Sequence, residues 1–402
     1  MTFYGLLQTR FMIPKIVIDL TSLTGKYGLG VETFAQGLTV GIIRSAQKVR
    51  FKILTSKKGE VWVRDFLDKA NLSGVVEISI VDPILPFILD KILALIYRGL
   101  LPSFLCSIIE NLKWMRLRVH YNKFIVIVPS TYLNVTFGKR TLVCLHDCQE
   151  TTYPHFFDKR QLRYRRIKLQ ATLNKAWKIQ VSSNFVKSEL LKIGHTQFDK
   201  FIVIPEGVDT KEFIHVEKLL SDSSTLQVFV PGSFLPHKNH SVIFDAVKTF
   251  KLDTNIVFFM TGTINDRALS FSQNLSENDR NRIVFLGFIS KKELIRYYHC
   301  SDVVLSASLY ESSSLPLLEG YSCGCVVVAS AIPAHNEMHE IIPKMYLFDP
   351  TSPYQLSEIL MKLAQDKISG KPLRPVDDTT LSKIDWSSNA NIYLRAILDH
   401  IN

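Results

Sequence analysis

The chain has 402 residues, of which 47% are hydrophobic and 21% are charged, and its net charge is +11. This length and composition suffice for two ordinary hydrophobic cores, so two domains are expected. No Gly/Ser linker or low-complexity run marks a third domain, and no internal repeat occurs at the periods of solenoids or propellers, which excludes those architectures.

The positive charge is concentrated in the first half of the chain. Residues 91–200 hold 19 Lys and Arg against 6 Asp and Glu, a local excess of 13. Such a basic surface suits phosphate-bearing lipids, an anionic membrane or nucleic acid. The six cysteines include no CxxC pair and the N-terminus lacks the arrangement of a signal peptide, so reduced thiols in a cytoplasmic protein are expected.

Strands and helices are predicted to alternate from the N-terminus onward. A strand over 15–23 runs into a turn with Gly25, Gly28 and Gly30, and a helix over 31–46 follows, as at the start of a doubly wound unit. The turn lacks the spacing and the later acidic residue of a GxGxxG dinucleotide fingerprint, which disfavours a dehydrogenase. Further strands of this half are predicted at 51–56, 76–82, 124–130, 141–147, 179–184 and 201–209.

Residues 83–120 combine long apolar runs with Arg98, Lys113, Arg116 and Arg118 and with the interfacial aromatics Tyr97 and Trp114. Charges and a proline interrupt this stretch too often for a spanning helix of about twenty apolar residues. Two interpretations stay open. The stretch forms an interfacial helix pair on an anionic membrane, or it forms ordinary buried helices whose basic side chains reach water.

The strand pattern restarts in the second half. Five near-continuous apolar runs at 226–234, 255–263, 282–289, 302–309 and 326–332 suggest a second parallel sheet. The polar stretch 208–225 marks the boundary. The predicted units are therefore 1–210, 211–385 and a terminal helix over 386–402.

Two glutamates, Glu311 and Glu319, flank the point where the strand over 302–309 gives way to a helix with Pro316 near its start. Serines 312–314 suit an N-cap, and the free N–H groups of the helix would accept an anion such as a diphosphate. Glu319, about one turn into the helix, could accept hydrogen bonds from the vicinal hydroxyls of a ribose. The alternative is a serine-capped helix with two solvated glutamates.

The segments ESSSLPLLEG and CGCVVVASAIPAHNE resemble the retaining glycosyltransferases of the GT4 type. The resemblance implies an α/β fold of the GT-B kind, in which two Rossmann-like doubly wound domains face each other across a cleft. It also implies that the last helix crosses back to the N-terminal domain. The N-terminal domain would bind the acceptor and the C-terminal domain would bind the nucleotide sugar.

The loop VPGSFLPHKN resembles the phosphate-binding loop of that family. Gly232 would let the backbone approach the donor, and Lys238 would place an ammonium on the leaving β-phosphate. Ser233 and His237 stand where many members of the family have arginine, which leaves one certain cation. Without the resemblance, Lys238 would be an ordinary solvated lysine.

His146 and Asp147 end a hydrophobic strand of the first half, where the family's histidine touches the donor sugar and a neighbouring acid helps to hold the acceptor. A structural His–Asp pair is the alternative. A zinc site at Cys144, His146, Cys148 and His155 is disfavoured by the ligand spacing. The resemblance thus implies catalytic roles for His146, Asp147, Lys238 and Glu311, and donor binding by Gly28, Gly30, Gly232, Ser233, His237, Lys238, Ser313, Ser314, Leu315 and Glu319.

No DxD motif occurs, so no metal-bridged diphosphate and no cofactor is predicted. The resemblance implies transfer with retention, in which the acceptor hydroxyl attacks on the front face, the leaving phosphate assists its deprotonation and Glu311 positions sugar hydroxyls. The expected partners are a nucleotide diphosphate sugar, a glycan or lipid-linked acceptor and an anionic membrane surface through residues 83–120. The alternatives are a degenerate protein that binds a nucleotide sugar without transfer and a basic nucleic-acid-binding protein, for which no base-stacking or groove-reading motif is present.

Overall fold

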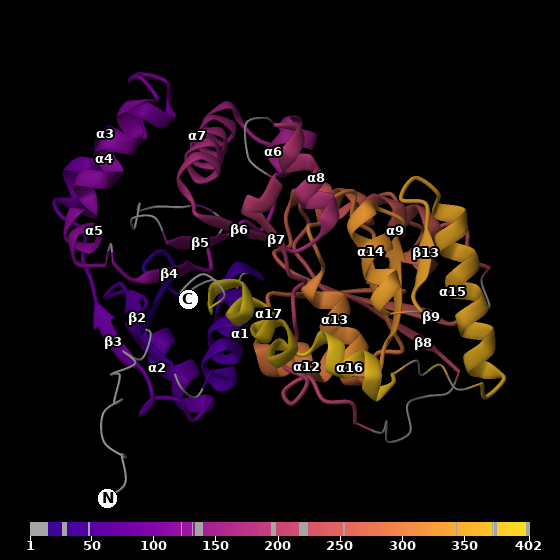
Figure 1. Cartoon of the computed structure of the whole chain (residues 1–402). Helices are drawn as coiled ribbons and strands as arrows, with labels where there is room; N and C mark the ends of the chain where they lie inside the picture. The colour runs from indigo at the N-terminus through magenta and orange to yellow at the C-terminus, as the bar shows by residue number, and fades with distance from the viewer. Residues whose placement is uncertain are drawn as a thin grey trace, which may run out of the picture.

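The computed structural model describes residues 15–25, 30–46, 49–121, 123–130, 132, 140–193, 198–216, 224–251, 254–342, 344–371, 373 and 376–398. These residues form two parallel sheets flanked by helices, which Figure 1 shows side by side. The predicted doubly wound architecture with two sheets is confirmed. Gly28, predicted to bind the donor, lies outside the described residues.

The first sheet has seven strands in the order β3-β2-β1-β4-β5-β6-β7, and all neighbours are parallel. Its strands carry runs of buried β-branched residues, as expected for a sheet covered on both faces. The bounds are Lys15–Asp19 (β1), Arg50–Thr55 (β2), Glu77–Ile80 (β3), Ile125–Val128 (β4), Thr141–Cys144 (β5), Lys178–Val181 (β6) and Phe201–Val203 (β7).

The second sheet has the order β10-β9-β8-β11-β12-β13 and is also parallel. Five of its strands were predicted, and the sixth, β13, was not, because its three residues are too few to show a pattern. The bounds are Leu226–Val230 (β8), Ile256–Thr261 (β9), Ile283–Gly287 (β10), Val303–Ser306 (β11), Val326–Ser330 (β12) and Tyr346–Phe348 (β13).

Helices cover both sheets. Those of the first half are α1 (Gly30–Ser45), α2 (Glu60–Lys69), α3 (Pro86–Tyr97), α4 (Leu105–Lys113), α5 (Met115–Tyr121), α6 (Gln149–Thr152), α7 (Lys159–Lys175) and α8 (Asn184–Lys192). Those of the second half are α9 (His240–Val247), α10 (Asp266–Gln273), α11 (Glu277–Arg280), α12 (Lys291–Cys300), α13 (Leu315–Ser322), α14 (Pro333–Ile341), α15 (Pro353–Ile368), α16 (Asp378–Ile384) and α17 (Trp386–Leu398). Short 3-10 turns occur at Pro154–Phe156, Phe198–Lys200 and Pro236–Lys238.

Residues 83–120 form three helices, α3, α4 and α5, rather than a pair, and Figure 1 shows them at the outer edge of the first half. They are not ordinary buried helices, because many of their large apolar side chains are exposed. Along the part of the chain that the structure describes, no helix is long and apolar enough to cross a bilayer. The exposed apolar residues are Leu85, Phe87, Ile88, Leu95, Leu100, Phe104, Ile108, Leu112, Met115 and Val119.

The terminal helix α17 crosses back and packs on α1, as predicted (Figure 1). Trp386 at its start is buried between the two halves. A Cβ on Gly37 of α1 would lie 2.1 Å from the indole nitrogen, and one on Gly207 would lie 2.9 Å from the indole ring. The two glycines therefore make the space that the indole fills.

The two halves also contact each other through polar groups at the opposite side. The Glu337 carboxylate of α14 accepts hydrogen bonds from the backbone N–H groups of Asn184 and Phe185 at 2.7 and 2.6 Å. These N–H groups begin α8, where a negative charge stabilises the helix. The Cys148 N–H donates to the Tyr310 hydroxyl at 3.2 Å.

Replacing Trp386 with Ala should lower the free energy of unfolding by about 3–5 kcal/mol, because a buried indole is lost and the space does not close. Urea unfolding measures the change. Ile392→Ala is the matched control, since this residue of the same helix is 43% exposed and its loss should cost about 0.5 kcal/mol or less. Equal losses in the two variants would contradict the role given to Trp386.

Candidate functional site

The chain reverses its winding direction between β8 and β11 in the second sheet, which leaves a crevice at the carboxyl ends of these strands. The loop after β8 carries Lys238 and the loop after β11 carries Glu311. Their side chains meet in an ion pair of 2.6 Å, and they are 21% and 14% exposed. The structure thus brings together two residues that lie 73 positions apart in the sequence.

Glu311 is held as an anion. Burial by itself would raise the pKa of this carboxyl, but the charges of Lys238 and His335 and hydrogen bonds from Lys238 and Ser308 outweigh it, so the pKa is lowered. The Ser308 hydroxyl donates to the carboxylate at 2.6 Å. Neither Ser308 nor His335 was predicted. The His335 Nε2 atom is buried and finds no partner among the described residues.

Gly232 gives the loop after β8 its shape. Its φ of +136° is one that side chains rarely adopt, and the Lys238 Cε atom lies 3.8 Å from the place of a Cβ. The Gly232 N–H donates to the Thr261 hydroxyl at 3.1 Å. Ser233 is partly exposed beside it. The backbone here is therefore accessible next to the ammonium of Lys238, as a phosphate-binding loop requires.

His146 follows β5 of the first sheet and is buried against Phe34, with ring centroids 4.4 Å apart. Burial lowers the pKa of His146, so the imidazole is neutral. The Nε2 atom lies 3.1 Å from the Pro129 carbonyl, so it must carry the proton. The Nδ1 atom is then an acceptor.

Asp147 is paired with Arg165 of α7, which also binds Glu150 at 2.9 Å. Sequence reasoning missed both partners. The Arg165 pKa is raised, because the attraction of Asp147 and of the groups around it outweighs the effect of burial. The negative charge of Asp147 is therefore compensated by the guanidinium of Arg165.

His237 lies where the two halves face each other. Burial and then the Lys238 charge lower its pKa, while Glu311 of its own half and Asp147 of the other half act in the opposite direction. The imidazole is therefore neutral at pH 7. Arg165 also lowers the pKa of His237, although Asp147 and Glu150 compensate the charge of this arginine.

Glu206, in the loop after β7, is a buried carboxyl that sequence reasoning missed. Burial and the neighbouring Glu311 raise its pKa to about 7, while Ser313, Ser182 and Lys238 act against the rise. The Ser182 hydroxyl donates to it at 3.5 Å. Ser313, predicted to bind the donor, is thus engaged with Glu206. The position of Glu206 after an apolar strand could have identified it as a candidate site residue, since the other candidates were found at the ends of such strands.

Glu319 lies one turn inside α13, as predicted, and is only 6% exposed. It accepts a hydrogen bond from the Tyr298 hydroxyl at 2.8 Å. Burial raises the pKa of this carboxyl to about 7, and that hydrogen bond only partly opposes the rise. Ser314 takes the N-cap position of α13, although its side chain makes no capping bond, and Leu315 is the first helical residue.

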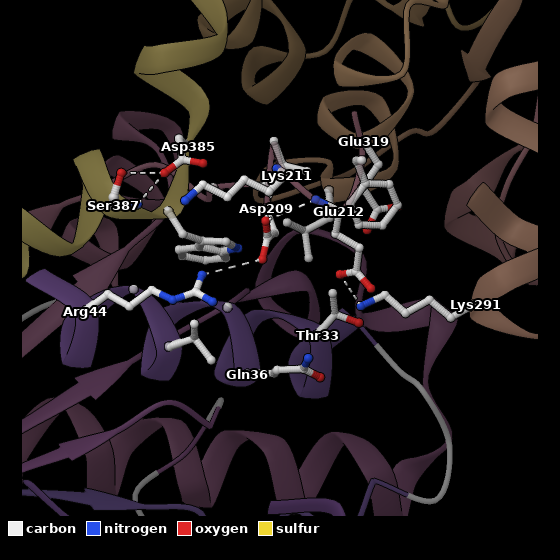
Figure 2. Close-up of a pocket in the computed structure, with 18 residues that line it drawn as sticks. Thr33, Gln36, Arg44, Asp209, Lys211, Glu212, Lys291, Glu319, Asp385 and Ser387 are labelled. Carbon is white, nitrogen blue, oxygen red and sulfur yellow. Dashed lines mark hydrogen bonds and ion pairs between the residues drawn. The ribbon is translucent and has the colours of Figure 1, made fainter. Parts of the chain in front are cut away.

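Glu319 and Leu315 line a cavity of about 120 Å³ between α1 and α13 (Figure 2). Figure 2 shows the ion pair of Lys291 with Glu212 at this cavity, at 2.6 Å. Glu311 is not among the lining residues, so the two glutamates serve two neighbouring parts of the site. Gly30 begins α1, and a Cβ there would meet no atom within 4 Å.

Residues 211–375 match the family model described as "Glycosyl transferases group 1". Among curated proteins, the chain is 23% identical over 260 residues to the O-antigen chain mannosyltransferase B of Escherichia coli, covering 61% of this chain and 66% of that protein. It is 29% identical over 152 residues to an Escherichia coli UDP-Gal:alpha-D-GlcNAc-diphosphoundecaprenol alpha-1,3-galactosyltransferase, covering 34% and 38%. The chain spans just under two thirds, or less, of the length of these relatives.

Solved structures share the fold over nearly the whole chain. HepE from Anabaena, crystallised with UDP and glucose, superposes with a TM-score of 0.68 at 15% identity and covers 96% of this chain and 100% of that one. WaaG, a glycosyltransferase involved in lipopolysaccharide biosynthesis, gives a TM-score of 0.60 at 14% identity and covers 94% of each chain. At this identity the likeness concerns the fold, which is GT-B.

The raised pKa of Glu319 makes stability depend on pH. An unfolded glutamate ionises near 4.5, whereas the folded protein keeps the proton up to about 7, so stability falls as pH rises between these values. Glu319→Gln should remove this contribution, on the order of 3 kcal/mol between pH 4.5 and 8. Urea unfolding at several pH values measures it, with exposed Glu358→Gln as control. A wild-type pH profile in Glu319→Gln would refute the assignment.

Proposed function

We propose that the chain is a retaining glycosyltransferase, because residues 211–375 match the glycosyl transferases group 1 model. It would move a hexose from a nucleotide diphosphate sugar to a hydroxyl of a growing glycan. The observation that carries the proposal is the Lys238–Glu311 ion pair at the crevice of the second sheet. No cofactor is needed, since the nucleotide sugar is a substrate.

The charges around the pair suit departure of a phosphate. Bond breaking at the anomeric carbon leaves negative charge on the β-phosphate, and the Lys238 ammonium is placed to balance it. Lys238 is held in place by Glu311 at 2.6 Å, so little reorganisation is needed during the reaction. Arg165 of the other half is also a cation, but Asp147 and Glu150 compensate its charge, so Lys238 carries this role.

The transfer forms one bond and breaks one bond on the same face of the sugar. The acceptor oxygen attacks the anomeric carbon, the bond from that carbon to the phosphate oxygen breaks, and the hydroxyl proton passes to the leaving phosphate. Glu311, an anion, would accept hydrogen bonds from sugar hydroxyls with its remaining lone pairs.

The first half would provide the acceptor side of the cleft. His146 would offer its neutral Nδ1 atom to the donor sugar, and Asp147, which Arg165 orients, would help to hold the acceptor. In the second half, Glu319 would take the ribose hydroxyls, and the backbone at Gly232 and Ser233 would approach the diphosphate. The ribose hydroxyls would favour the ionised form of Glu319, so nucleotide affinity should rise with pH through about 7.

The printed names of the relatives guide the choice of substrates to test. One is a mannosyltransferase of O-antigen chains and another a galactosyltransferase that acts on a diphosphoundecaprenol-linked sugar. Mannose and galactose donors and a lipid-linked or surface polysaccharide acceptor are therefore the first candidates. Such an acceptor places the protein at the cytoplasmic membrane face.

A protein that binds a nucleotide sugar without transferring it is the second candidate. Two observations favour it: Ser233 stands where the family has arginine, and the Lys238 charge is already compensated by Glu311. In this case the nucleotide sugar would bind but no acceptor would be glycosylated.

Thermal unfolding with a panel of nucleoside diphosphates and nucleotide sugars tests donor binding, since a ligand of the native state raises the unfolding temperature. One donor should stabilise wild type but not Glu319→Ala.

Lys238→Gln should lower kcat by about 100-fold or more, because a cation at the leaving phosphate is lost. Exposed Lys248→Gln is the matched control and should behave as wild type. Binding without turnover by wild type would favour the second candidate, and no binding would overturn both.

Membrane association through residues 83–120 belongs to the same proposal. Phe104, the N-cap residue of α4, and Ile108 and Leu112 of that helix are spaced four residues apart, so they form one exposed stripe. They are 68%, 50% and 47% exposed. Arg98, which follows α3, and Arg116 of α5 are exposed on the same group of three helices. An apolar stripe with basic residues beside it suits the surface of an anionic bilayer. Of the predicted basic residues, Lys113 contributes less, because it pairs with Asp90 at 2.5 Å.

Replacing both Ile108 and Leu112 with Glu should weaken binding to phosphatidylglycerol vesicles at least tenfold. Each aliphatic side chain would lose about 1 kcal/mol of burial, and each new charge would repel the lipid. Vesicle sedimentation measures the change. The double variant Val61→Glu, Val75→Glu, at exposed positions outside residues 83–120, should bind as wild type does. Unchanged binding of the α4 variant would exclude this surface.

A further inference from the structure

A groove separates α4 from α7 on the outer side of the first half, away from the cleft. Its volume is about 530 Å³, which is in the range of small-molecule sites. We call it the α4–α7 groove and define it by Ser107, Glu110 and Asn111 of α4 and by Arg166, Lys168 and Lys175 of α7. None of these residues takes part in the transfer step proposed above.

The charges of the groove favour an anion. Three basic side chains face one carboxylate, which leaves a formal charge of +2. Glu110 is already paired with Lys168 at 2.6 Å, and both side chains are nearly buried. Arg166 is exposed at the rim and makes no ion pair or hydrogen bond with the described residues. The guanidinium of Arg166 therefore gives the rim of the groove a positive charge that is available to a ligand.

The donors of the groove suit a phosphate group. A guanidinium binds two phosphate oxygens at once, and ammonium, hydroxyl and amide groups can donate to the others. Lys175 and Ser107 are already joined by a hydrogen bond from the ammonium to the hydroxyl, so these two donors are held side by side. The volume exceeds that of a bare phosphate and leaves room for an attached glycerol or sugar.

The position of the groove points to a lipid as the carrier of the phosphate. Phe104 lines the groove and is also 68% exposed in the apolar stripe of α4, so it borders both. A lipid whose acyl chains meet the stripe would have its headgroup at the groove. Because the groove and the stripe adjoin at Phe104, one lipid molecule can reach both.

We propose that the α4–α7 groove binds the phosphate of an anionic glycerophospholipid headgroup and so fixes the orientation of the protein on the membrane. The lipid source rests on the membrane association in the proposed function, whereas the phosphate chemistry stands on the groove alone. Arg165, the neighbour of Arg166 on α7, faces Asp147 and Glu150 at the cleft. Successive helical residues point about 100° apart. A headgroup held by Arg166 therefore fixes the angle between the cleft and the membrane surface.

Calorimetric titration with dihexanoyl phosphatidylglycerol below its micelle concentration tests the groove without a bilayer and without sugar transfer. Wild type should bind it at least tenfold more tightly than dihexanoyl phosphatidylcholine, whose choline cation the groove would repel. Arg166→Gln should weaken binding at least tenfold, because a bidentate donor is lost. Arg160→Gln, an exposed arginine of the same helix outside the groove, should bind as wild type does.

Three results would overturn the inference. They are no binding of the short-chain lipid, equal loss in Arg160→Gln and Arg166→Gln, and inorganic phosphate or glycerol 3-phosphate binding as tightly as the lipid, which would make the groove a site for free phosphate. Donor binding and turnover are measured separately, so failure of the groove leaves the glycosyltransferase proposal untouched. Vesicle binding that persists in Arg166→Gln while short-chain lipid binding is lost would support a role in orientation.

Discussion

The chain crosses between the two halves twice, once near Val208 and once near Trp386. The relative placement of the halves depends on the contact between these two crossings. The Val208 N–H donates to the Ile384 carbonyl at 2.8 Å, and the Trp386 N–H donates to the Val208 carbonyl at 3.2 Å. The two crossings are thus bonded to each other, and the buried indole of Trp386 fills the space left by Gly37 and Gly207. Every feature of the cleft, from His146 on one side to Lys238 on the other, presupposes this joint.

Electrostatic compensation distinguishes two groups of carboxyls in the cleft, and Glu150 belongs to neither, because burial raises its pKa although it pairs with Arg165. Glu311 has an ammonium at 2.6 Å and Asp147 has a guanidinium, so both are ionised partners of fixed cations. Glu206 and Glu319 form no ion pair among the described residues, and burial raises their pKa values to about 7. The first group suits fixed charge during transfer, and the second suits groups whose charge changes when a ligand arrives.

The sequence was sufficient for the architecture because parallel strands buried on both faces leave continuous apolar runs. Two strand sets and the returning helix were predicted, whereas β13 was too short to see. Motif residues such as Glu311 and Lys238 were found individually, but their ion pair depends on sheet order. Arg165 was one basic residue among many in α7, and only folding places it against Asp147. The buried state of Glu319 likewise follows from packing, since folding places it against the buried Tyr298 of α12.

Neighbouring arginines of α7 belong to two different sites, although in the sequence they form a single basic run. Arg165 is directed to the carboxylates of the cleft, while Arg166 lies in the groove toward α4. The charges of Asp147 and Glu150 compensate that of Arg165, so this arginine does not attract anions to the cleft without selection. Arg166 keeps its charge for a ligand outside the cleft. The local excess of basic residues thus need not imply nucleic acid, because its members differ in direction and in partner.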